Sequence, residues 1–363
     1  MKLIGITGSC GKTSTAEIVY QYLLYSGRGA SLYGSNGLFV NGLTREKDFL
    51  QTTPYLKELE VHLDDDRESG VEYGIVEISA ESVNRGDRVH VLQYDILALT
   101  SFYERLHNHF DGKEHYAECK RKILTTPNVK KVLMRLEDEG YTYFSDIPHT
   151  TYGYGENVTH RMQVIRNEMD GLTLYYQGVK FKTNLITAYH ARNMACALAI
   201  LTELGVLDME KFVEFAKGIN IRGRFEKLNV GGKTVIIDTG LAGALITLVG
   251  IEKPFDSTNY RIIYSSVHYR EENEWVREAR DRAGRYLKRG NFIYLTNPEG
   301  VLGEEEVFLK DVVKEEGYDK YRYIPDINEA CQAALNELAP GEILIVFSRE
   351  HYRKYRECFE KLR

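Results

Sequence analysis

The sequence predicts two consecutive α/β domains, each built around a mostly parallel sheet. An apolar run enters a glycine-rich turn and then a helical pattern at the start, and apolar strands alternate with helical segments in both halves. Between the two series, residues 161–184 contain alternating runs separated by Asp170-Gly171 and Gln177-Gly178, which is typical of an antiparallel meander. A chain of 363 residues is also too long for one ordinary core.

The first half has the elements of a doubly wound sheet. Lys2–Thr7 is a predicted strand, followed by a helix over about 12–24. Tyr73–Ile78 and residues 94–100 are continuous apolar runs, as expected of interior parallel strands that bury both faces. Helices are predicted near 113–124, 188–204 and 208–218.

A second alternating series follows Arg222-Gly223-Arg224, so we place the boundary near residue 222 and expect domains at 1–222 and 223–363. Strands are predicted at 234–238, 260–265, 291–295 and 342–347, and helices near 273–289, 304–316, 327–338 and 350–360.

Composition and charge argue against several classes of function. The net charge is −6 and the pI is near 6.0, whereas nucleic-acid-binding domains usually carry a basic footprint. No run of about 18 apolar residues is present, so we expect no membrane span, and the start lacks the long apolar segment of a signal peptide. The five cysteines form no CxxC pair, which argues against a zinc ribbon or a disulfide framework and favours a cytoplasmic location.

A glycine-rich turn, Gly5-Ile6-Thr7-Gly8-Ser9-Cys10-Gly11-Lys12-Thr13-Ser14, joins the first strand to the first helix. Its glycines let backbone N–H groups turn inward around phosphate oxygens, and the helix N-terminus favours an anion. Lys12 is placed for the β- and γ-phosphates and the Thr13 hydroxyl for Mg²⁺, although Ile6 stands where the strict motif has glycine. The alternative is a turn that only caps a helix. The predicted nucleotide-binding residues are Gly8, Ser9, Cys10, Gly11, Lys12, Thr13 and Ser14.

A carboxylate stands at the end of a second strand, where ligands bind in open α/β sheets. Glu77 closes the apolar run Tyr73–Ile78 and is a candidate to hold Mg²⁺ against the nucleotide phosphates, the alternative being a solvated strand-end glutamate. A phosphate loop indicates a nucleotide but not a reaction, since kinases, switches and ligases all carry one.

Six further motifs follow the loop in order, and their order and rough spacing resemble the Mur ligase family. The closest likeness is to its MurE type, which adds the third amino acid to the peptidoglycan precursor. The motifs are Thr52-Thr53-Pro54, Glu77-Ile78-Ser79, Thr100, the segment 107–120 (HNHFDGKEHYAECK), Tyr189-His190-Ala191-Arg192-Asn193 and Gly223-Arg224-Phe225-Glu226.

The resemblance implies roles for the residues that match. Lys120 would be carbamylated by CO₂ and its carbamate would help to hold a second Mg²⁺, with His107, or else His109, at the metal site. From the residues alone, Lys120-Arg121-Lys122 is instead a solvated helix face. The implied catalytic set is Lys12, Glu77, His107 and Lys120; the metal set is Thr13, Glu77, His107 and Lys120; and Asn193, Arg224 and Asp238 join the phosphate loop in binding ATP.

The resemblance also implies how the substrates are held. The acid substrate would be bound by four residues: Thr52, Thr53, Ser79 and, after a one-residue insertion, Arg88. An arginine suits this role because its planar guanidinium binds a carboxylate bidentately. Arg88 is otherwise a surface arginine. Asn297 lies in the segment that matches the family's amino-acid-selecting DNPR motif.

Several departures suggest different substrates. The chain begins at the phosphate loop, so we expect the family's N-terminal UDP-sugar-binding domain to be absent. Where the family has the motif TN, this chain has Thr100-Ser101. The family motif DHLD is replaced by a poorly matching stretch around residues 105–108, and of the family motif DYAHTP only Asp238 is retained. DNPR is replaced by Asn297-Pro298-Glu299-Gly300 within its segment, and Phe347-Ser348-Arg349-Glu350-His351 stands where the family has GKGHE.

The sequence therefore predicts an ATP-dependent ligase that activates a carboxylate as an acyl-phosphate and couples it to an amine. Its substrates would be a small-molecule acid and an amine or amino acid. The acid would either lack a UDP group or be delivered by a partner protein. An intramolecular cyclase or amidase with the same chemistry, and an ATP-binding regulatory protein whose catalytic groups have decayed, remain alternatives. A kinase fits less well because it gives Glu77, His107 and Lys120 no obvious role.

Overall fold

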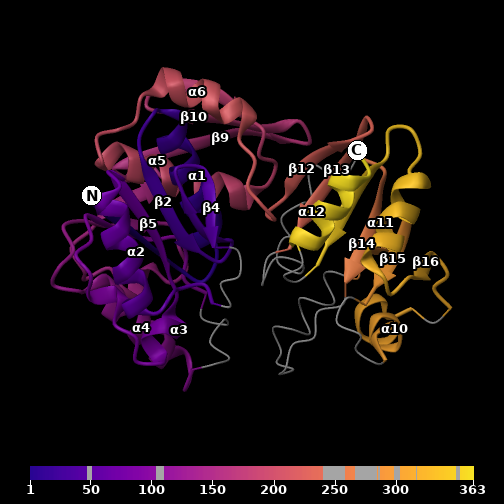
Figure 1. Ribbon diagram of the computed structural model, residues 1–363, viewed down its shortest axis with the longest axis horizontal. Coiled ribbons are helices and arrows are strands. Elements are labelled where there is room, and N and C mark those ends of the chain that lie inside the picture. Colours follow the sequence, from indigo (N-terminus) through magenta and orange to yellow (C-terminus); the bar gives the residue numbers. More distant parts are fainter. Residues whose placement is uncertain are drawn as a thin grey trace. The chain divides into compact units, whose positions relative to one another are not determined.

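The computed structural model divides the chain into two compact units, Met1–Ile219 and Asn220–Arg363, each with its own sheet (Figure 1). The residues that the structure describes are 1–46, 51–103, 110–239, 258–265, 284, 287–297, 303–315, 317–348 and 352–363.

Strand β1 (Lys2–Thr7) lies inside the sheet of the first unit, between β5 (Tyr73–Ile78) and β6 (Ile96–Leu99) and parallel to both. The register pairs Thr7 with Ile78 on one side and with Leu99 on the other. The carboxyl ends of these three strands therefore meet at one edge, where ligands bind in open α/β sheets.

The complete sheet has eleven strands in the order β11-β10-β9-β8-β7-β6-β1-β5-β2-β3-β4. On one side of β5, β2 is parallel to it and continues into the antiparallel strands β3 and β4. On the other side, β7 and β8 extend the parallel part, and a parallel pairing of β8 with β9 joins the meander to it. These strands are β2 (Ala30–Gly34), β3 (Gly37–Val40), β4 (Leu43–Glu46), β7 (Val132–Arg135), β8 (Thr150–Gly153), β9 (His160–Glu168), β10 (Gly171–Tyr176) and β11 (Val179–Thr183).

Helices cover both faces of this sheet. Helices α1 (Lys12–Tyr25) and α5 (Ala188–Glu203) pack against each other on one face, and α6 (Met209–Gly218) joins them. On the other face, α2 (Leu56–Glu68) and α4 (Lys113–Leu124) contribute Leu59, Leu63 and Ile123 to a cluster with strand residues. The short elements are α3 (Ala80–Asn84) and the 3₁₀ turns Val89–Val91 and Tyr141–Tyr143.

The second unit has a six-stranded sheet in the order β12-β13-β17-β14-β15-β16, parallel except for the β12–β13 hairpin. Helices α11 and α12 share one core cluster with this sheet. Its strands are β12 (Glu226–Val230), β13 (Lys233–Asp238), β14 (Tyr260–Ser265), β15 (Phe292–Thr296), β16 (Tyr321–Tyr323) and β17 (Ile343–Phe347), and its helices are α10 (Glu304–Val307), a π-helical turn (Phe308–Val313), α11 (Ile327–Asn336) and α12 (Tyr352–Lys361).

The predicted fold class is confirmed, including the meander and the mostly parallel sheets. The predicted helix near 304–316 is α10 followed by the π-helical turn, and most of the predicted helix near 273–289 lies outside the described residues. All five cysteines are free thiols. Among the described residues no helix has the length and apolarity to cross a membrane.

The two turns of the meander give a matched pair of glycines. A Cβ on Gly171, at φ +139°, would lie 1.9 Å from the Thr183 carbonyl oxygen, whereas one on Gly178, at φ +83°, would meet nothing within 4 Å. We predict that Gly178→Ala lowers the free energy of unfolding by about 1–2 kcal/mol, the cost of left-handed backbone. Gly171→Ala should cost clearly more in a denaturant titration. Equal losses would show that the close approach to Thr183 is not maintained in solution.

Candidate functional site

The phosphate loop turns at two glycines that no other residue can replace without strain. Gly8 has φ +149° and a Cβ there would lie 2.0 Å from the Thr100 hydroxyl oxygen; Gly11 has φ +89° and its Cβ would lie 2.4 Å from the Asn193 side-chain oxygen. Gly11 is the N-cap of α1, which has neither a side-chain cap nor an acidic residue in its first turn. A helix N-terminus of this kind favours an anion.

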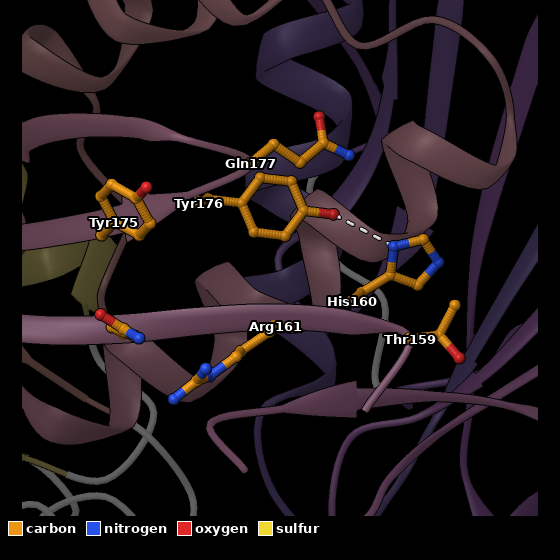
Figure 2. Close-up of a pocket in the computed structure, with 7 residues that line it drawn as sticks. Thr159, His160, Arg161, Tyr175, Tyr176 and Gln177 are labelled. Atoms are coloured by element: carbon orange, nitrogen blue, oxygen red, sulfur yellow. Dashed lines mark hydrogen bonds between the residues drawn. The ribbon is translucent and has the colours of Figure 1, made fainter. Parts of the chain in front are cut away.

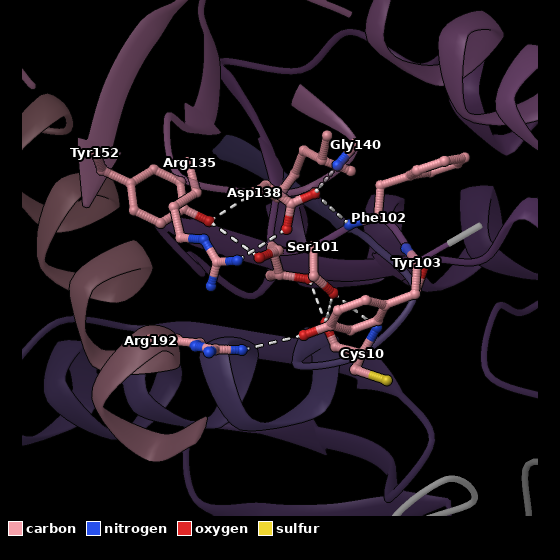
Figure 3. A network of polar contacts seen from close by, with 12 residues as sticks. Cys10, Ser101, Phe102, Tyr103, Arg135, Asp138, Gly140, Tyr152 and Arg192 are labelled. Atoms are coloured by element: carbon pink, nitrogen blue, oxygen red, sulfur yellow. Dashed lines mark hydrogen bonds and ion pairs between the residues drawn. The ribbon is translucent and has the colours of Figure 1, made fainter. Parts of the chain in front are cut away.

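The end of β6 holds this loop in place (Figure 3). The Ser101 hydroxyl accepts a hydrogen bond from Cys10 N at 3.0 Å, and its backbone oxygen accepts one from Ser9 N at 2.8 Å. The Thr100 hydroxyl donates to the Cys10 carbonyl at 2.5 Å. The loop therefore has a fixed shape before any ligand binds.

Two lysine side chains converge on one carbonyl oxygen of the loop. Lys12 Nζ donates to Gly8 O at 2.9 Å, and Lys120 Nζ donates to Gly8 O at 3.1 Å and to the Thr7 hydroxyl at 3.0 Å. Lys120 is only 1% exposed, so the solvated helix face considered from the sequence does not hold for this residue, whereas Lys122 is exposed and pairs with Glu118. Burial, and then the charge of Lys12, hold the pKa of Lys120 well below its usual range. Burial and the neighbouring Lys12 charge therefore both disfavour the protonated form of this amine.

On the other side of β1, a buried carboxylate meets the first turn of α1. Glu77 is 1% exposed, accepts a hydrogen bond from the Thr13 hydroxyl at 2.8 Å and another from Ser35 N at 3.0 Å. A carboxylate and a hydroxyl beside a phosphate loop fit Mg²⁺, which is usually held by one or two protein oxygens together with phosphates and water. Within the described residues, no group of three or more His, Cys, Asp or Glu side chains is placed to hold a metal by itself.

The predicted acid-binding threonines and serine lie beside Glu77. The Thr53 hydroxyl accepts from Ser79 N at 2.8 Å and lies 3.0 Å from the Glu77 carbonyl oxygen, and the Ser35 hydroxyl donates to that of Thr52 at 3.2 Å. These contacts bring Thr52, Thr53 and Ser79 to the same sheet edge as the phosphate loop.

The arginine that reaches this segment is Arg85. Its guanidinium donates to the Thr53 carbonyl at 3.0 Å, pairs with Asp87 at 3.3 Å and lies over the Tyr55 ring at 4.7 Å. Arg88, the arginine predicted for this role, is exposed. Arg85 lies three positions before Arg88, and no local pattern in the sequence indicates which of the two contacts Thr53.

The remaining predicted residues divide between the units. Asn193, 8% exposed, lies against Gly11 in the first unit. His107 and His109 lie outside the described residues. In the second unit, Arg224 donates to the Gly223 carbonyl at 3.0 Å, Asp238 is buried at the end of β13, and Asn297 donates to the Tyr323 hydroxyl at 3.1 Å.

A polar network that the sequence did not reveal lies beside the loop. Asp138 is 7% exposed and accepts hydrogen bonds from Phe102 N at 2.9 Å and Gly140 N at 3.2 Å, besides an ion pair with Arg135 at 3.0 Å (Figure 3). It fixes the backbone that follows Ser101. Asp138 follows an apolar strand, but that position alone does not identify its partners.

A separate cavity of about 260 Å³ opens on the meander (Figure 2). There a hydrogen bond of 3.2 Å joins His160 Nδ1 to the Tyr176 hydroxyl, and His160 Nε2 lies 2.7 Å from a carboxylate oxygen of Glu203. The cavity is lined by residues of β9 and β10 and their neighbours, not by the strand ends that carry the phosphate loop: Thr159, His160, Arg161, Gln163, Tyr175, Tyr176 and Gln177.

Comparison with known proteins decides the family. Residues 6–201, more than half of the 363-residue chain, match the family model of the Mur ligase middle domain. The chain belongs to the Mur ligase family. Members of this family are ATP-dependent ligases that form amide bonds, and the chain is an enzyme of that class.

Its relatives differ in substrate. A UDP-N-acetylmuramoyl-L-alanyl-D-glutamate–2,6-diaminopimelate ligase of Helicobacter hepaticus is 24% identical over 96% of this chain and 75% of that protein. A folylpolyglutamate synthase of Thermotoga maritima has the same fold, with TM-score 0.74, 16% identity and coverage of 99% of this chain and 89% of the other. A bifunctional folylpolyglutamate/dihydrofolate synthase of Yersinia pestis, complexed with AMPPNP and a Mn ion, has TM-score 0.69, 15% identity and coverage of 99% and 89%.

The close packing of Gly34 against Glu77 tests the metal side of this site. A Cβ on Gly34 would lie 2.0 Å from Glu77 Oε1, and the buried carboxylate has to leave Thr13 and Ser35 to make room. We predict that Gly34→Ala weakens Mg²⁺-dependent ATP binding, measured by calorimetry, by about 10–100-fold, the usual effect of disturbing a metal ligand's surroundings. Gly218→Ala is the control because its Cβ would meet nothing within 4 Å. Equal affinities in the two variants would refute a role for Glu77 in metal binding.

Proposed function

We propose that the protein joins a carboxylic acid to an amine in an ATP-dependent reaction that passes through an acyl-phosphate, acting on a substrate other than the usual UDP-MurNAc-peptide. The observation that carries the proposal is the edge formed by β1, β5 and β6. There the phosphate loop with Lys12 and Lys120 lies next to the Glu77–Thr13 pair, and Thr53 and Ser79 lie beside Glu77.

In the proposed reaction, a carboxylate oxygen of the acid attacks the γ-phosphorus while the bond from that phosphorus to ADP breaks. The amine nitrogen then attacks the acyl carbon and phosphate leaves, the amine losing a proton, so the products are an amide, ADP and phosphate. Lys12 offsets charge on the transferring phosphoryl group, and the loop N–H groups hold the β-phosphate. Mg²⁺ bound by Thr13 and Glu77 would add Lewis-acid stabilisation of the phosphoryl oxygens.

Lys120 is proposed to carry a carbamate. A buried, neutral amine is the form that reacts with CO₂: an N–C bond forms and the nitrogen loses a proton. The product is an anion beside Lys12, where an ammonium would be repelled. Its oxygens would suit a second Mg²⁺, together with His107 or His109. Support comes from the burial of Lys120 and its lowered pKa.

The substrates are proposed to bind at two places. Thr52, Thr53 and Ser79, with Arg85 or Arg88, would hold the acid, while the second unit would supply the amine site at Asn297 and ATP contacts at Arg224 and Asp238. We propose the domains as 1–222, which binds ATP, and 223–363, with a hinge near 222–226 whose closure would keep water from the acyl-phosphate. The boundary after Ile219 supports this division.

A panel of acids and amines, read by phosphate release in a bicarbonate-containing buffer, tests the proposal. We expect release only when ATP, one acid and one amine are present together, and no release from the Lys12→Ala variant. Release with an acid alone, with a cyclised product, would favour an intramolecular cyclase. Tight ATP binding with no acid-dependent release across the panel would contradict catalysis and favour a regulatory role.

The path of one oxygen atom separates acyl-phosphate formation from simple ATP hydrolysis. With a panel acid labelled by oxygen-18 in its carboxylate, one label should appear in the released phosphate, because the carboxylate oxygen that attacked phosphorus leaves with it. Mass spectrometry of the phosphate measures this. Phosphate that takes its new oxygen from water instead would rule out the acyl-phosphate.

The two neighbouring lysines of α4 give a matched pair. Lys120→Ala removes the buried amine beside Gly8, so we predict that acid-dependent phosphate release falls to background and that added bicarbonate does not restore it. Lys122→Ala removes an exposed lysine of the same helix and should leave the rate close to that of the unaltered protein. Full activity in Lys120→Ala would remove the carbamate from the mechanism.

A further inference from the structure

A third cation approaches the phosphate loop from α5. Arg192 lies in the second turn of this helix, and the next residue, Asn193, lies against Gly11 of the loop. The Arg192 guanidinium donates to the Tyr103 hydroxyl at 3.2 Å (Figure 3). It also lies over the Tyr189 ring, 5.5 Å from its centroid. Two aromatic residues thus orient the charged group without neutralising it.

Tyr103 ties this arginine to the loop. The backbone N–H of Tyr103 donates to the Ser9 hydroxyl at 2.9 Å, and the Ser9 hydroxyl also bonds to that of Tyr116 at 2.7 Å. Burial raises the pKa of the Tyr103 hydroxyl, so it stays uncharged at neutral pH. Arg192 is therefore held at a set position relative to Ser9 by an uncharged partner.

The nearby carboxylates are already committed to other groups. Asp138 pairs with Arg135, and both side chains are more than nine-tenths buried, so their charges offset each other. The second Asp138 oxygen accepts two backbone N–H groups. Glu137 accepts from Tyr154 N at 2.7 Å and Gly155 N at 2.5 Å. In the described part of the chain, no carboxylate lies within ion-pair distance of Arg192.

We propose that Arg192 binds the phosphate chain of the nucleotide, as a positioning residue beside the loop, an inference that rests on the proposed ATP binding. Arg192 is half-buried next to the phosphate loop, and among the described residues no carboxylate pairs with it, so a phosphate anion would be a suitable partner. Its planar fork can bond two phosphate oxygens at once, which a lysine cannot do. Lys12 lies within the loop and Arg192 reaches it from α5, so the phosphates would be held between groups on two helices.

The test is ATP binding by the full chain over a series of KCl concentrations, with Mg²⁺ present. Arg192→Gln should weaken binding at low salt by about 10-fold or more, in line with the loss of a charge-assisted hydrogen bond. It should also flatten the dependence of affinity on salt, because one screened attraction is gone. Arg192→Lys should keep most of the salt dependence while binding less tightly than the unaltered protein.

Two controls make the outcome decisive. Arg166→Gln makes the same substitution at an exposed arginine of β9 and should change neither affinity nor salt dependence. Tyr103→Phe removes only the hydroxyl that orients Arg192, so it should weaken binding less than Arg192→Gln and leave the salt dependence unchanged. In turnover assays Arg192→Gln should raise KM for ATP more than it lowers kcat.

Unchanged ATP affinity in Arg192→Gln, or weaker binding with an unchanged salt dependence, would overturn the inference. Failure of the unaltered protein to bind ATP would instead overturn the proposed function itself. The unfolding temperature of each variant without nucleotide shows whether a loss of binding comes from a loss of fold.

Discussion

Two lysine nitrogens lie within hydrogen-bond distance of one carbonyl oxygen, and the repulsion between their charges is the main electrostatic constraint on the site. Lys12 Nζ and Lys120 Nζ lie 2.9 and 3.1 Å from Gly8 O and so within about 6 Å of each other. Two unit charges at about 6 Å repel by about 3 kcal/mol at an effective dielectric constant of about 20. Burial adds a further cost to charging Lys120, so its pKa lies well below the usual range of a lysine, and an anion at this position would offset the charge of Lys12.

The sheet topology creates this crowding. Because β1, β5 and β6 run parallel in register, Gly8, Ser79 and Thr100 begin the loops at one edge, and groups distant in sequence meet there. Glu77, which accepts a hydrogen bond from the Thr13 hydroxyl, puts a carboxylate on the β5 side of β1, and two lysines lie at the loop on the other side. An open edge of this kind, with donors and a carboxylate already fixed in place, is suited to phosphoryl transfer, in which catalysis is mostly positioning and charge stabilisation.

The parts of the site that the sequence predicted are those set by local geometry. Glycine spacing identified the loop, and an apolar run ending in a carboxylate identified Glu77. The sequence also contains a pattern that indicates the burial of Lys120. Lys120 lies on the same face of α4 as Tyr116, Ile123 and Leu124, but the adjacent charged residues favoured an exposed position.

The rest depends on contacts between distant segments. The contact of Arg85 with Thr53 depends on the loop after α3, and the Asp138–Arg135 pair and the Arg192–Tyr103 contact form only when β6, β7 and α5 are assembled. The eleven-stranded sheet was likewise foreseen only in part, because the β8–β9 pairing that joins the meander to it is a tertiary contact.

The most direct test of the central claim, that the buried Lys120 amine carries a carbamate, is carbon-13 NMR of the protein equilibrated with ¹³C-bicarbonate. We expect a carbamate resonance that is retained in Lys122→Ala and absent from Lys120→Ala. No carbamate resonance in the unaltered protein, or one that persists in Lys120→Ala, would contradict it.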